Sequence, residues 1–118
     1  MMIKQQLDHI VTVTKQAGIP ATIDPPRITP PGAWICARRL STQTLPGHFA
    51  TVADVYLIAR DTGIVQAIET LDEMLETIID AIDEDDQLEI VGSALDESVT
   101  LPHAVAPLPA YRLTLEIL

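Results

Sequence analysis

The feature that most constrains the fold is an apolar stripe between residues 64 and 82. Apolar side chains recur there at spacings of three and four, which is the spacing of one helix face, and acidic side chains fill most other positions. We therefore expect a helix about 28 Å long that packs on a core with one face only, capped by Asp61 or Thr62. The stripe comprises Ile64, Ile68, Leu71, Leu75, Ile78 and Ile82, widened by Ala67, Met74 and Ile79.

A shorter helix is expected from about residue 2 to Ala17, because Ile3, Leu7, Ile10, Val11 and Thr14 share one face. Gly18 and Pro20 end it. Residues 24–32 hold four of the nine prolines, so we expect a stiff, non-helical loop there. Residues 41–50 are expected to form a turn or an exposed loop.

Extended segments are expected at residues 21–23, 33–40, 51–60, 87–94 and 111–117, with a possible short strand at 98–101. The last strand alternates, with its odd-numbered residues on one side. These elements predict one α+β domain covering residues 1–118, with an antiparallel or mixed sheet of about four strands and two helices packed on one face. A chain of 118 residues is long enough to bury one core.

The charge of the chain is divided unevenly. Residues 1–60 hold six basic and three acidic groups, a net +3, whereas residues 61–118 hold one basic and fourteen acidic groups, a net −13. The acidic half repels nucleic-acid phosphates, so DNA binding through it is not expected. The alternative is an acidic face that only keeps the protein soluble.

No pattern of catalytic or ligand residues stands out, so we expect no enzyme activity, no cofactor and no metal. His9, His48 and His103 lie far apart without metal-ligand spacing. Cys36 is the only cysteine and is expected to be a small buried side chain. The five scattered glycines form no phosphate loop. No signal peptide or membrane span is expected, and a reducing cytoplasm suits the single cysteine.

Five residues are candidates for contact with another protein: Trp34, Arg38, Arg39, Tyr56 and Tyr111. Trp, Tyr and Arg are enriched at interfaces, although ordinary packing on a sheet would equally explain them. A nucleic-acid patch at Arg38 and Arg39 is not favoured, because adjacent strand residues point to opposite faces and the chain is acidic.

Three segments form a loose signature: residues 17–25 (Ala-Gly-Ile-Pro-Ala-Thr-Ile-Asp-Pro), residues 30–35 (Pro-Pro-Gly-Ala-Trp-Ile), and the final Tyr-x-Leu-x-Leu strand at residues 111–115. In these segments the chain resembles the tail terminator proteins of long-tailed bacteriophages, especially those of actinobacteria. The order of elements also agrees over nearly the whole chain. The resemblance rests on this order and a loose loop signature, and it supplies no catalytic residue.

The resemblance implies a virion protein, assembled in the host cytoplasm, that forms a ring of six subunits on the finished tail tube. The ring stops tube growth and joins the head connector or stopper, and DNA passes through it. The loops at residues 24–32 and 41–50 are the expected docking elements. An acidic channel would keep DNA from sticking, and its candidate residues are Asp83, Glu84, Asp85 and Asp86. Alternatives are another neck component, such as a head completion or stopper protein, and a small-ligand regulatory domain.

Overall fold

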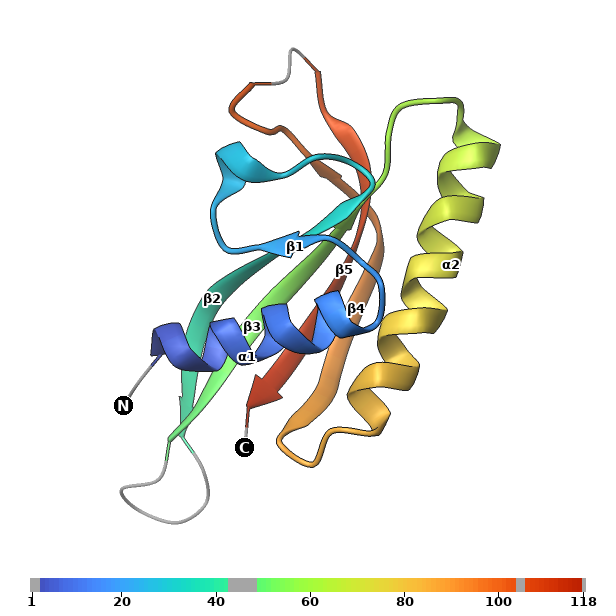
Figure 1. Cartoon of the computed structure of the whole chain (residues 1–118). Helices are drawn as coiled ribbons and strands as arrows, with labels where there is room; N and C mark the ends of the chain where they lie inside the picture. Colours follow the sequence, from blue (N-terminus) through green and yellow to red (C-terminus); the bar gives the residue numbers. More distant parts are fainter. Residues whose placement is uncertain (1–2, 43–48, 104–105, 118) are drawn as a thin grey trace.

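A five-stranded mixed sheet organises the fold (Figure 1). The computed structural model describes residues 3–42, 49–103 and 106–117. Its strands follow the order β1-β2-β3-β5-β4, in which β1 runs parallel to β2 and the other neighbours are antiparallel. The elements are α1 (Ile3–Gln16), β1 (Ala21–Thr22), a 3-10 turn η1 (Pro25–Arg27), β2 (Gly32–Thr42), β3 (Phe49–Ile58), α2 (Ile64–Asp83), β4 (Leu88–Val99) and β5 (Leu108–Ile117). The expected α+β class is confirmed.

Both helices begin or end at a glycine with a positive φ. Gly18 follows α1 with φ 92°, and its N–H donates to the Lys15 carbonyl. Gly63 precedes α2 with φ 107° and provides no side-chain cap. The expectation that Asp61 or Thr62 caps α2 was therefore wrong. The Thr62 N–H already donates to the Arg60 carbonyl in a tight turn, and the left-handed conformation that follows favours glycine.

The main core lies between the two helices and one face of the sheet, which we call the helix face. Alternation along the strands places alternate residues here, including Val55 and Leu57 of β3 and Leu113 and Leu115 of β5. Figure 1 shows α1 crossing the sheet and α2 running along its β4 side. From α2 the core takes Ala67, Leu71, Met74, Ile78 and Ile82.

A smaller core lies on the opposite, helix-free face of the sheet. Its buried residues are Ile28, Ile58, Val99, Leu101 and Ala110. The 3-10 turn η1 brings Ile28 there, so the expectation that residues 24–32 contain no helical turn was wrong. A single 3-10 turn suits Pro25 and Pro26 because proline presets φ. The turn is closed by the Ile28 N–H donating to the Pro25 carbonyl at 3.2 Å.

Three β-bulges interrupt the pairing of the strands. On β2, Ala37 pairs with Ala53 and Arg39 pairs with Val52, which is the next residue along β3. Arg38 is therefore an extra residue on β2. On β4, extra residues occur between Ile90 and Gly92 and between Ala94 and Glu97. As a result β4 continues to Val99, which unites the two strands expected at residues 87–94 and 98–101. The loop expected at residues 41–50 is shortened by β2 and β3, and residues 43–48 lie outside the described residues.

Candidate interaction surfaces

Two of the predicted contact residues stack on the helix-free face. The ring centroids of Trp34 and Tyr56 lie 5.3 Å apart with 22° between the ring planes. Trp34 on β2 is paired with Tyr56 on β3, so the stack is a cross-strand pair of neighbouring strands. Both side chains are half-buried. They form a stiff aromatic platform on a face that neither helix covers.

A buried carboxylate lies beside this platform. Asp54 is 4% exposed and accepts a 2.7 Å hydrogen bond from Thr114 Oγ1. Arg38 Nη1 lies 3.6 Å from Asp54 Oδ1. A buried charge is costly unless it is paired and hydrogen-bonded, and Thr114 and Arg38 together meet this need. Arg38 is therefore held in place by the fold.

The bulge on β2 places both arginines on the helix-free face. Arg39 pairs with Val52, which alternates with the core residues of β3 and so faces away from the helices. Arg38 reaches Asp54 and Thr114 on that same face. The expectation that adjacent residues here point to opposite faces was wrong, because the extra residue interrupts alternation. Only the net charge of −10 then disfavours a nucleic-acid patch at Arg38 and Arg39.

A second arginine network borders the stack. Arg112 Nη1 lies 3.2 Å from Glu97 Oε1, and a hydrogen bond with Tyr56 is the main cause that raises the pKa of Arg112. Arg112 Nε and Trp34 Nε1 are enclosed, and neither has an acceptor within the described residues. Half-buried Cys36 lies nearby. Burial, then the charge of Asp54, raises the pKa of its thiol.

Tyr111 lies on the other side of the sheet from these residues. It is buried in the main core, and its hydroxyl donates a 3.1 Å hydrogen bond to Asp72 of α2. Burial is the main cause that raises the pKa of Tyr111. The structure thus brings Trp34, Arg38, Arg39 and Tyr56 onto one face and assigns Tyr111 to the attachment of α2.

The four predicted channel residues lie at the C-terminal end of α2 and in the turn to β4. Asp83, Glu84 and Asp86 are exposed. Asp85 differs, because its Oδ2 lies 2.8 Å from His9 Nε2 of α1 and its Oδ1 accepts a hydrogen bond from the Gln87 N–H. Asp85 therefore joins this turn to α1 through the half-buried His9.

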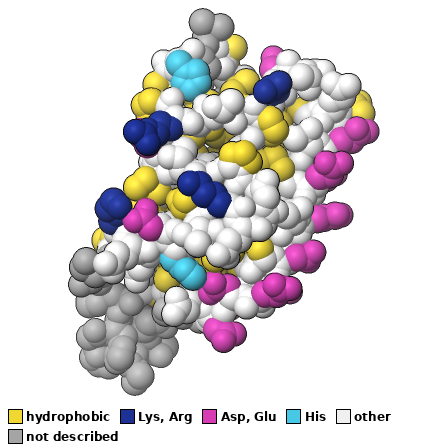
Figure 2. Space-filling view, viewed as in Figure 1, with side chains coloured by type: hydrophobic (Ala, Val, Ile, Leu, Met, Phe, Trp, Pro, Cys, Tyr) yellow, Lys and Arg dark blue, Asp and Glu magenta, His cyan; other side chains and the backbone are white. Residues whose placement is uncertain are grey.

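Charge is separated between the two sides of the molecule. The carboxylates of Glu69, Glu73, Glu76 and Asp80 on α2 are exposed, and none of them forms an ion pair with the described part of the chain. On the face drawn in Figure 2, acidic side chains follow the α2 side, and the Lys and Arg side chains in view lie mainly toward α1, β1 and β2.

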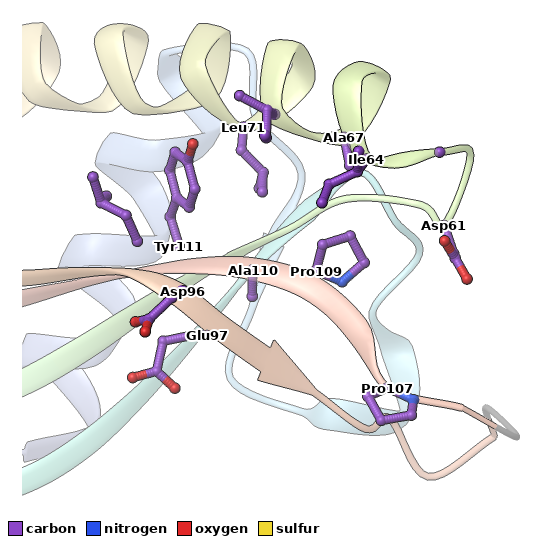
Figure 3. Close-up of a pocket in the computed structure, with 13 residues that line it drawn as sticks. Asp61, Ile64, Ala67, Leu71, Asp96, Glu97, Pro107, Pro109, Ala110 and Tyr111 are labelled. Atoms are coloured by element: carbon purple, nitrogen blue, oxygen red, sulfur yellow. The ribbon is translucent and has the colours of Figure 1, made fainter.

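An open groove lies between the N-terminal half of α2 and the end of β4 (Figure 3). Its volume is about 480 Å³, and Tyr111, Ala110 and Pro109 of β5 lie among its lining residues. Ile64 and Ile68 line the α2 side, and Leu95 and Asp96 line the β4 side. The expectation that Ile64 and Ile68 pack on the core was wrong, because they are 79% and 44% exposed. The sequence contained one sign that the start of this helix is exposed: Val65 is apolar but lies just outside the stripe.

No family model, curated protein sequence or solved structure matches this chain. Within residues 3–42, 49–103 and 106–117, no three His, Cys, Asp or Glu side chains gather in a way that could hold a metal ion. No helix in the described part of the chain is long and apolar enough to cross a membrane. The surfaces described above are therefore the features from which a function can be argued.

Proposed function

We propose that this protein is a structural subunit that assembles head to tail with copies of itself. The separation of charge carries this proposal. The acidic side along α2 and the basic side near β2 are two different surfaces of one subunit, and each attracts the other on a neighbouring copy. Contacts between two different surfaces produce closed rings when the rotation closes.

Within this class we propose a tail terminator, a ring of six subunits on the end of a phage tail tube. The sequence resemblance to that family supports this choice. The exposed carboxylates of Asp83, Glu84 and Asp86 suit the wall of a DNA channel, because like charge keeps the duplex from adhering. The helix-free face, with its aromatic stack and Arg38, suits docking to the tail tube or to the connector.

The test is the mass of the purified protein measured by light scattering at several concentrations, alone and mixed with the tail tube protein. A hexamer, either alone or on tube ends seen by electron microscopy, is the expected result. A protein that binds the portal and ignores tube ends would instead be another neck component. One that stays monomeric with both partners would contradict an assembly role.

A further inference from the structure

The groove between α2 and β4 is lined by exposed apolar side chains, as a contact surface is before its partner binds. Ile64, Ile68 and Leu95 are 79%, 44% and 56% exposed, and all three line the same groove. Burial of such side chains is favourable by about 25 cal/mol per Å² of apolar surface. Grouped apolar side chains on a surface mark a site where another molecule packs.

The chemistry of the rim restricts the occupant. Asp61 and Asp96 line the groove, are exposed, and form no ion pair within the described residues. Glu97 is already paired with Arg112. The α2 wall is apolar, and the carboxylate of Asp96 on β4 points away from α2 (Figure 3). The matching occupant therefore presents an apolar side chain toward α2 and a cation on its other side.

The end of β2 in this same chain presents that combination. Leu40 is 44% exposed, and Arg39 is exposed without an ion pair among the described residues. Leu40 pairs with Thr51 and Arg39 with Val52, so their side chains lie on opposite sides of the strand. An extended segment lying in the groove would therefore direct Leu40 to the α2 wall and Arg39 to the β4 wall.

The end of β2 is also accessible along its outer edge. β1 pairs only with Ala33 and Trp34, so no described strand covers that edge of β2 beyond Trp34. In the sheet order, β3 and β5 separate β2 from β4. The end of β2 and the groove therefore lie on different sides of one subunit, and a contact between them is between different surfaces, as head-to-tail assembly requires.

We propose that the groove receives the end of β2 from a second copy of this chain. Leu40 of one copy packs against Ile64 and Ile68 of the next, and Arg39 pairs with Asp96. This assignment rests on the proposed ring and names the contact that builds it.

Charge reversal tests the pairing. Arg39→Glu alone and Asp96→Lys alone are each expected to weaken self-association about tenfold or more, because each puts like charges together. A mixture of the two variants is expected to recover assembly. The carboxylate introduced in one variant then meets the ammonium group introduced in the other, and every second contact keeps the original Arg39 and Asp96. Assembly is measured by light scattering, alone and on tail tube ends.

Two further variants serve as matched controls. Lys15→Glu and Glu76→Lys change the net charge by the same amounts as the two test variants. Both positions are exposed, lie outside the groove and form no ion pair in the described chain. They lie on the acidic and basic sides but outside the groove contact, so they are expected to weaken self-association much less than Arg39→Glu and Asp96→Lys do. Thermal unfolding of all four variants checks that each is folded.

The outcomes separate this inference from the proposed function. If the wild type caps tubes and Arg39→Glu and Asp96→Lys each also assemble normally, the groove contact is overturned and the terminator role stands. Variants that fail singly and do not recover when mixed also overturn the pairing. A wild type that self-associates through the groove but ignores tube ends overturns the terminator role alone. Loss of tube binding in Ile68→Asp with normal self-association would assign the groove to the tube protein and overturn the contact between copies.

Discussion

At the scale of single residues, Arg38 and Arg39 are adjacent arginines with different roles. Arg38 compensates the buried Asp54, whereas Arg39 has no ion pair among the described residues. Arg38→Ala is expected to lower the free energy of unfolding by about 1–2 kcal/mol, because a buried carboxylate loses a charged partner. Arg39→Ala is the control and is expected to change it by less than about 0.5 kcal/mol. Urea unfolding measures both, and equal losses would contradict the assignment.

Tyr111 predicts a dependence of stability on alkaline pH. Burial and the hydrogen bond to Asp72 raise its pKa above 10.0, so the unfolded chain releases this proton at lower pH than the folded chain. The free energy of unfolding is therefore expected to fall as the pH rises above about 10. Tyr111→Phe should reduce this fall and cost about 0.5–1 kcal/mol at neutral pH through the lost hydrogen bond. Urea unfolding from neutral to alkaline pH measures both effects, and an unchanged pH dependence in the variant would contradict the argument.

Sequence alternation predicted which way most side chains of β5 point, including Tyr111, because regular strands alternate. It failed at Arg38, since a single extra residue on β2 creates a bulge that no local pattern marks. It also could not separate Asp85 from its acidic neighbours, because the bond to His9 joins residues 76 positions apart. Contacts between distant segments have no periodic signature.

At the scale of elements, Asp85 fastens α1 to the turn between α2 and β4. Asp85→Ala is expected to lower the free energy of unfolding by about 1–2 kcal/mol, since it removes the His9 contact and the hydrogen bond from the Gln87 N–H. The neighbouring Asp86→Ala is the control, with an expected change below about 0.5 kcal/mol. Chemical denaturation checks this, and indistinguishable variants would show that Asp85 is only a surface charge.

The two halves of the α2 stripe should differ in their contribution to stability. Ile78 is fully buried, whereas Ile64 is mostly exposed. Ile78→Ala is expected to cost about 2–5 kcal/mol because it leaves a cavity. Ile64→Ala should cost less than about 0.5 kcal/mol in the monomer. Thermal unfolding at low protein concentration distinguishes them, and a large loss for Ile64→Ala would mean that the start of α2 belongs to the core.

Helical periodicity predicted α2 with its correct start, but it could not show how much of the apolar stripe the sheet would bury. The stripe continues from Ile64 to Ile82, although the buried α2 residues begin at Ala67. The groove results from this mismatch, and its other wall depends on the extra residue of β4 between Ala94 and Glu97. The 3-10 turn at Pro25–Arg27 was missed because proline predicts the end of α-helices more directly than the presence of one tight turn.

At the scale of the whole molecule, separated charge makes association sensitive to salt. If copies attract one another through their basic and acidic sides, raising NaCl from about 50 mM to about 500 mM should reduce the average mass in solution, because the Debye length shortens. Light scattering at constant protein concentration measures this. A mass that stays constant or rises with salt would indicate contacts that are mainly apolar.

The bulges of β4 disfavour one kind of assembly, the addition of strands at this border of the sheet. A long, regular strand at the border of a sheet invites identical chains to add one after another, and such growth has no natural end and leads to fibres. Two interruptions in β4, together with Glu89 and Asp96 along it, make that addition unfavourable. Strand addition along β4 is therefore disfavoured, and side-chain docking is left as the route by which this border of the sheet joins another copy.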